Sequence, residues 1–155
     1  IGQCTELSYF DGYFNSLVGS LPSEIGQCTK LMHFDVRNST LDGSIPSEIG
    51  WCTELTYFDV YSNNLVGSLP SEIGECKELT YIDLYSNYLV GSIPSEIGQC
   101  TKLTWLSFQD ILFMDPFQMK LAIVQSLYIW ILVTIHLLDP FQMKLVSVQI
   151  SLTLI

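Results

Sequence analysis

The chain has 155 residues, of which 48% are hydrophobic and 14% are charged, and its formal net charge is −10. This length suffices for one buried core or for one continuous array of repeats. Most of the acidic residues lie in the first 108 positions, and an acidic surface cannot release counterions from phosphates, so we expect no nucleic-acid partner. The sequence starts at Ile1 without a charged and then apolar leader, so no targeting peptide is expected in this stretch.

The first 108 residues repeat with a period of 24 residues. Five copies begin at equally spaced isoleucines, which are Ile1, Ile25, Ile49, Ile73 and Ile97. A fixed period of this size is typical of a solenoid, in which every repeat forms one coil and stacks on the next. We therefore expect one domain over residues 1–108, with four complete coils and part of a fifth.

A short strand is predicted near the middle of each copy. Positions 10 and 12 of the repeat are apolar and are separated by one polar residue, as in Ile82, Asp83 and Leu84. This alternation is typical of a half-buried strand. Further apolar columns at positions 1, 7, 17 and 21 complete the surface that a coil can bury against its neighbours.

The second half of each copy is built for turns. Asparagine at position 15, as in Asn63 and Asn87, can satisfy backbone groups where the chain leaves the strand. Glycine at position 19 allows a tight bend. Proline at position 22, as in Pro70 and Pro94, predicts an extended return segment and argues against a helix there.

These columns resemble the plant-type leucine-rich repeat, whose unit has the form LxxLxLxxNxLxGxIPxxIGxL. The resemblance covers residues 1–108 and implies a mainly-β solenoid of 24-residue coils, with short parallel strands on its concave face. Members are commonly ectodomains of receptor-like kinases or secreted inhibitor proteins that bind peptides, proteins or glycans, so it also implies an extracellular or cell-surface parent protein. Ser39 and Gly12 depart from the pattern, and we expect the first two coils to be looser.

A cysteine recurs at position 4 of every copy, where the family usually has leucine: Cys4, Cys28, Cys52, Cys76 and Cys100. Neighbouring coils lie about 5 Å apart, so disulfides between them are geometrically allowed, but we favour a stack of small buried thiols. No spacing suits zinc. The expected core includes Cys28, Cys52, Cys76, Leu55, Leu79, Ile82, Leu84, Asn63 and Asn87.

A candidate binding face follows from positions 9, 11 and 13, which point away from the core in a strand. These columns are mostly aromatic, acidic and aromatic, and the expected contact residues are Tyr57, Asp59, Tyr61, Tyr81, Asp83, Tyr85 and Trp105. Aromatic side chains with polar tips are good contact residues, and the carboxylates favour a basic protein or peptide partner. The alternative is a plain solvated face, because near-identical repeats produce such columns by copying alone.

Neither catalysis nor a cofactor is expected. His33 and His136 are isolated, and no serine or cysteine has the sequence context of a nucleophile. The aspartates lie in a row and do not converge, so we expect no metal site.

Residues 109–155 lack the repeat's amino acids and form an apolar tail, which we expect to be irregular or helical. The run Leu121–Leu138 contains no charged residue and has the minimum length of a membrane span. A genuine span here would make the chain the ectodomain and anchor of a membrane receptor.

The tail nevertheless keeps the period of the repeat. The string DPFQMKL occupies Asp115–Leu121 and again Asp139–Leu145, one period later. Read one base earlier, these codons can encode GSIPNEIG, the lost repeat in its own register. Met114 has only one codon, ATG, and its last base is the first base of the recovered glycine codon. The tail thus looks like two further repeats translated off-frame, attached to a fragment whose repeats still bind a ligand. A further alternative is that the whole chain is the non-functional product of a frameshifted or misread gene.

Overall fold

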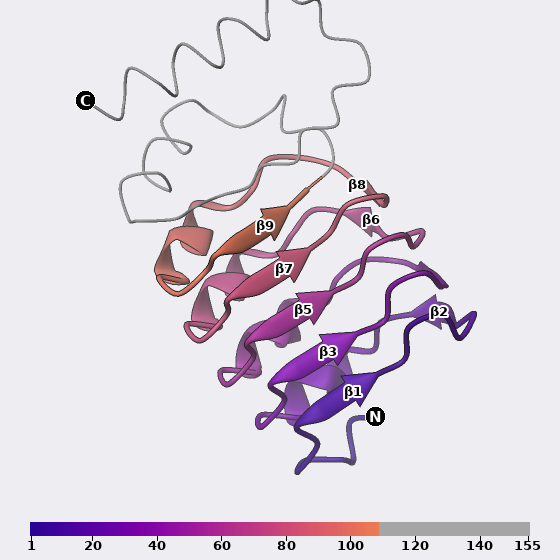
Figure 1. Ribbon diagram of the computed structural model, residues 1–155, viewed down its shortest axis with the longest axis horizontal. Coiled ribbons are helices and arrows are strands. Elements are labelled where there is room, and N and C mark those ends of the chain that lie inside the picture. The colour runs from indigo at the N-terminus through magenta and orange to yellow at the C-terminus, as the bar shows by residue number, and fades with distance from the viewer. Residues whose placement is uncertain (109–155) are drawn as a thin grey trace, which may run out of the picture.

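The computed structural model describes residues 1–108 of the chain, which form a stack of coils (Figure 1). Each coil contributes one strand to a five-stranded parallel sheet of order β1-β3-β5-β7-β9. Its strands are β1 (Tyr9–Asp11), β3 (His33–Asp35), β5 (Tyr57–Asp59), β7 (Tyr81–Asp83) and β9 (Trp105–Ser107). The predicted strand, the 24-residue coil and the parallel solenoid are all confirmed.

The register of this sheet repeats without a slip. Tyr57 lies opposite Tyr81, and Asp59 lies opposite Asp83, so equivalent residues of successive coils are direct neighbours. Aromatic residues suit a pleated, half-buried surface, and every strand carries at least one of them at position 9 or 10. Side chains at the same repeat position therefore lie side by side along the whole sheet.

Two small parallel sheets lie on the side reached after the asparagine turn, and neither was predicted. One pairs β2 (Val18–Ser20) with β4 (Thr40–Asp42), and the other pairs β6 (Val66–Gly67) with β8 (Tyr88–Leu89). The glycine at position 19 lies within or just after these strands and has a positive φ, +80° at Gly67, as the predicted tight bend requires.

The expectation of an extended return segment is wrong. Short 3₁₀ helices follow the prolines on the face opposite the main sheet: η1 (Ser23–Gln27), η2 (Ser47–Trp51), η3 (Ser71–Glu75) and η4 (Ser95–Gln99). Pro70 itself is extended, with φ −68° and ψ 144°, and stands just before the helix, where no N–H is needed. Its carbonyl accepts the N–H of Ile73.

Neighbouring helices approach closely because the second residue of each copy is glycine. A Cβ added at Gly50 in η2 would lie 2.4 Å from the carbonyl oxygen of Glu72 in the next helix, η3, and Gly74 has the same relation to Glu96. A side chain at this position would force the coils apart. The packing role of this glycine column was not predicted from the sequence.

One continuous apolar strip fills the space between the sheet and the helices. The structure buries all of the residues that the sequence placed in the core: Cys28, Cys52, Cys76, Leu55, Leu79, Ile82, Leu84, Asn63 and Asn87. Every coil packs on its neighbours through this strip, so the hydrophobic stabilisation is shared along the solenoid and is not concentrated in one centre.

The asparagine at position 15 joins two coils. The Oδ1 atom of Asn63 accepts the N–H of Leu41, and its Nδ2 donates to the carbonyls of Val36 and Val60. Asn87 repeats this arrangement one coil further on. Each amide therefore satisfies buried backbone groups of its own coil and of the preceding one, as predicted for the turn.

The second coil lacks this link. Ser39 stands at position 15 there, and its hydroxyl is buried without a hydrogen-bond partner. Asn15 in the first coil donates only to the nearby carbonyl of Tyr13. The first two coils thus lack the hydrogen bonds that the position-15 side chain forms between coils further along the solenoid.

Four cysteines are buried in a row, but the expectation is wrong for Cys4, which is exposed on the first coil. The thiol of Cys76 donates to the carbonyl of Ile49 in the preceding coil at 3.4 Å, and Cys52 and Cys100 do the same in theirs. Burial raises the pKa of Cys76 to about 12, so this thiol stays protonated at neutral pH. The five cysteines, all within residues 1–108, are free thiols.

Within residues 1–108, no helix is long and apolar enough to cross a membrane. The run Leu121–Leu138 and the off-frame tail both lie outside the described residues.

Candidate ligand-binding face

Five aromatic rings form a continuous stack along the exposed side of the main sheet. They are the side chains of position 9, namely Tyr9, His33, Tyr57, Tyr81 and Trp105. The ring centroids of Tyr57 and Tyr81 are 4.4 Å apart and their planes differ by 8°. In-register parallel pairing places each ring directly beside the next, and we call this row the ring stack.

The ring stack hides its faces and presents its edges. Tyr57 has a ring on both sides, His33 at 4.4 Å and Tyr81 at 4.4 Å, so neither of its faces is open to a ligand. The side chains of Tyr57, Tyr81 and Trp105 are half-buried. A partner can therefore meet ring edges here, but it cannot lie flat on an interior ring.

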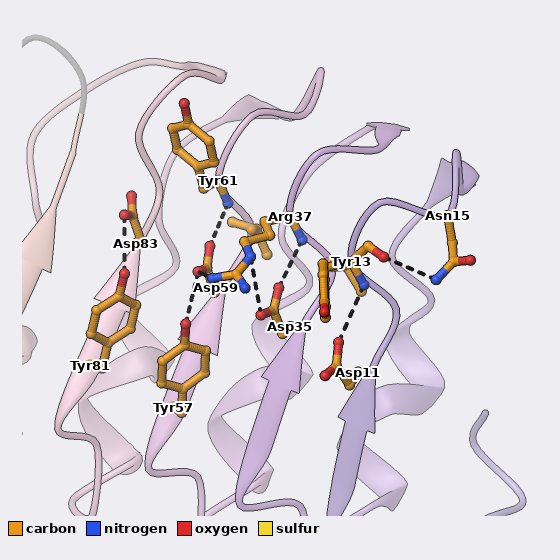
Figure 2. Close-up of polar contacts among 12 residues, drawn as sticks. Asp11, Tyr13, Asn15, Asp35, Arg37, Tyr57, Asp59, Tyr61, Tyr81 and Asp83 are labelled. Atoms are coloured by element: carbon orange, nitrogen blue, oxygen red, sulfur yellow. Dashed lines mark hydrogen bonds and ion pairs between the residues drawn. The ribbon is translucent and has the colours of Figure 1, made fainter.

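An aspartate fixes two tyrosines in each of the third and fourth coils. Asp59 accepts the hydroxyl of Tyr57 at 3.0 Å and the backbone N–H of Tyr61 at 2.9 Å (Figure 2). Asp83 repeats both bonds with Tyr81 and Tyr85. These carboxylates thus hold the face in one arrangement before any ligand arrives.

The expectation that the aspartate row faces solvent is wrong for two members. Asp35 is 3% exposed and Asp59 is 1% exposed, whereas Asp83 is half-buried. Arg37 lies 3.5 Å from each of these two buried carboxylates, and Asp59 also accepts the Tyr57 hydroxyl. Burial raises the pKa of Asp59, and the bonds from Tyr61 N–H and the Tyr57 hydroxyl counteract part of this shift.

The tyrosines beside these carboxylates remain neutral. Burial raises the pKa of Tyr57 and of Tyr81, and the adjacent Asp59 and Asp83 raise it further. Both hydroxyls therefore keep the proton that they donate to the aspartates. The charge of this region resides on the carboxylates and on one arginine.

That arginine is Arg37, which was not among the site residues expected from the sequence. Its Nε lies 3.5 Å from Asp35 and its Nη1 lies 3.5 Å from Asp59. Its guanidinium also stands over the ring of Tyr13, 4.9 Å from the centroid (Figure 2). Position 13 is tyrosine in the other coils of residues 1–108. The single basic residue in this column was the feature of the sequence that could have pointed to Arg37.

A second aromatic row follows position 13. Tyr61 and Tyr85 are half-buried, their planes differ by 9°, and their centroids are 6.1 Å apart, which is looser than the ring stack. The seven residues expected to contact a ligand thus all lie on the main sheet or directly after it. Six are half-buried, and Asp59 is enclosed beneath its neighbours.

The repeats match a known family. The model of the family described as Leucine Rich Repeat matches residues 54–76 and 78–100. No curated protein matches the sequence. Together with the solved structures described next, this match shows that the repeats of the chain are leucine-rich repeats of the plant type, and that the described residues form a mainly-β leucine-rich-repeat solenoid. The fold is that of a recognition domain.

Solved structures that resemble this chain include ectodomains of plant receptor kinases. One is the ectodomain of the membrane receptor kinase GASSHO1/SCHENGEN3 from Arabidopsis thaliana, in complex with CASPARIAN STRIP INTEGRITY FACTOR 2. It is 35% identical over 72% of this chain and 14% of that chain, with a TM-score of 0.67. The ectodomain of the Arabidopsis receptor kinase HAESA, in complex with an N-terminally extended IDA peptide hormone ligand, is 27% identical over 84% of this chain and 22% of that chain, with a TM-score of 0.72.

A third similar structure is the BIR3–SERK2 complex from Arabidopsis thaliana. It is 32% identical over 73% of this chain and 56% of that chain, with a TM-score of 0.60. The chain therefore spans less than two thirds of the length of each of these three structures.

Proposed function

We propose that the main sheet binds a peptide or an extended segment of a protein. The observation that carries this proposal is the pair of aromatic rows on one face, with Tyr57 and Tyr81 fixed by Asp59 and Asp83. Six of the seven expected contact residues are half-buried and can meet a ligand, whereas the enclosed Asp59 holds Tyr57 and Tyr61 in place from beneath. Recognition, and not catalysis, is the function that this arrangement supports.

The order of these side chains lowers the cost of binding. A side chain that must be immobilised on binding costs about 0.5–1.5 kcal/mol, and rings already held by stacking and by a hydrogen bond avoid most of that cost. Tyrosine and tryptophan also dominate the energetics of protein interfaces, because they bury a large area with few rotatable bonds.

The relatives support the chemical class of the partner. Two of the similar ectodomains were solved with a bound factor or peptide hormone, and a third structure is a complex of two proteins. These complexes are consistent with a peptide or protein partner for this chain. The ring stack gives less support to the glycan alternative, because sugars bind aromatic side chains through ring faces and the interior faces here are covered.

The experiment that tests the proposal selects binders from a phage-displayed library of random linear peptides on the full chain. We expect Tyr57→Ala and Tyr81→Ala to weaken the selected peptides by about tenfold or more each, as truncated aromatic contact residues do. Tyr88→Ala is the matched control, because Tyr88 is exposed on β8, outside the main sheet. Equal losses in all three variants, or no selected peptide, would refute the proposal.

The role of the whole chain depends on residues 109–155. An ectodomain with an anchor at Leu121–Leu138 would place the same binding face on a membrane receptor, whereas an off-frame tail would remove the anchor. We propose the off-frame origin, because the recovered repeats fall in the register of the described coils.

A further inference from the structure

We propose that the ligand of the main sheet presents an arginine side chain, whose guanidinium binds Asp83 beside Tyr61 and Tyr85. This inference rests on the proposed function and specifies its chemistry. It names the group that the ligand must carry and the coil at which that group binds.

The chain already contains one guanidinium bound by this face. Arg37 bridges the carboxylates of Asp35 and Asp59, which are register partners on β3 and β5, and it covers the ring of Tyr13. The side chain thus uses both the charge and the flat shape of the guanidinium group. An intramolecular arginine shows which group this combination of carboxylates and tyrosine accepts.

Asp83 continues the same row without a cation. It is the register partner of Asp59 and accepts the same two hydrogen bonds, from the Tyr81 hydroxyl and the Tyr85 N–H. Among residues 1–108 no basic side chain forms an ion pair with it, because Arg37 reaches only Asp35 and Asp59. Ser107 replaces aspartate in the next coil, so in the described part of the chain the row of carboxylates ends at Asp83.

The surroundings of Asp83 make a cation favourable there. Its carboxylate is half-buried, whereas that of Asp59 is enclosed, so a group from outside can reach it. Tyr85, whose backbone N–H bonds Asp83, pairs its ring with that of Tyr61, and rings from the same column as Tyr13 are thus available to a cation here. A charge held partly away from water interacts more strongly than one on an open surface.

Arginine fits this place better than lysine. The guanidinium is planar, covers an aromatic ring and directs several N–H groups at carboxylates, whereas an ammonium group is a strongly hydrated point charge. Arg37 displays each of these features within the same face. A peptide with an arginine is therefore the ligand that suits this surface.

The test uses the peptides selected from the random library on the full chain. Each selected peptide is resynthesised with citrulline, an uncharged isostere, in place of arginine, and its dissociation constant is measured by calorimetry. We expect the exchange to weaken binding to the wild-type chain by about tenfold and to have little effect on the Asp83→Asn variant. Asp42→Asn is the control, because it removes an exposed aspartate of β4, away from the main sheet.

Asp83→Ser serves as a second variant, since serine occupies the same position in the next coil. Selected peptides that depend on Tyr57 and Tyr81 but tolerate citrulline would overturn this inference and leave the proposed function intact. A citrulline effect of equal size in wild-type and Asp83 variants would also overturn it, because the arginine would then bind elsewhere. Failure to select any peptide would refute both.

Discussion

The side chain at position 15 adds hydrogen bonds between coils in some repeats and lacks them in the second. Asn63 forms four hydrogen bonds to backbone groups of two coils, whereas Ser39 at the equivalent place in the preceding coil leaves its own hydroxyl unpaired in a buried position. A buried polar group without a partner costs about 1–3 kcal/mol. The second coil is therefore destabilised at one residue, and a single substitution there can improve it.

We expect Ser39→Asn to raise the free energy of unfolding by about 1–2 kcal/mol, because the amide can bond the backbone of the first and second coils. Urea denaturation of the full chain measures this change. The reverse substitution Asn63→Ser is the matched control and should destabilise the chain by about 1–3 kcal/mol. A Ser39→Asn variant that unfolds more easily than wild type would show that the first coils are not arranged as described.

At the scale of the element, the close packing of the 3₁₀ helices depends on glycine. Gly50 lies against the carbonyl of Glu72 so closely that a Cβ would stand 2.4 Å from the oxygen, and this oxygen belongs to the backbone. The neighbouring coil cannot yield by turning one side chain. A larger residue must move a whole coil.

We predict that Gly50→Ala lowers the free energy of unfolding by about 1–3 kcal/mol, the usual cost of overpacking. Thermal and urea unfolding followed by circular dichroism measure the loss. Ser47→Ala tests the same helix at an exposed position and should change stability by less than about 0.5 kcal/mol. If Gly50→Ala were as stable as wild type, the helices could not be in the described contact.

How much of this structure the sequence predicts depends on the range of the interaction. The strand at Tyr81–Asp83, the asparagine links and the buried columns follow from alternation and period, which are local. The helix at Ser71–Glu75 does not follow from the same pattern, because proline excludes a helix only up to its own position and permits one directly after it. A strand as short as β6, with two residues, cannot show an alternation of apolar and polar residues, so the sequence pattern does not predict it.

The candidate site was predictable in outline and not in its electrostatics. The repeat places Tyr57, Asp59 and Tyr61 on one face, and the structure agrees. The surroundings of Asp59 also include a side chain from another coil, since Arg37 of the preceding coil lies 3.5 Å from its carboxylate. The repeat pattern does not predict that contact, because position 13 is arginine in one coil of the described residues and tyrosine in the others.

At the scale of the whole molecule, each coil of a solenoid contacts only its neighbours, so the array can be extended by adding copies. The last described coil contributes β9 and Phe108, and the family pattern of amino acids stops there. The period of 24 residues continues through the two DPFQMKL strings. We propose that two more coils are encoded beyond this point and are translated off-frame.

The nucleotide sequence across codons 100–155, from genomic DNA and from transcript, tests this proposal. We expect the frame one base earlier to be open and to encode GSIPNEIG at both strings. A single-base deletion between about codons 104 and 113 would account for the change, because the repeat identities fade over that stretch.

Met114 and Trp130 constrain the outcome most, since each has one codon, and both end in the guanine that the recovered glycine and strand aspartate require. Stop codons in that frame, or codons that do not restore the repeat, would contradict the proposal. Leu121–Leu138 would then be selected sequence, and an anchored receptor would become the better account of the chain.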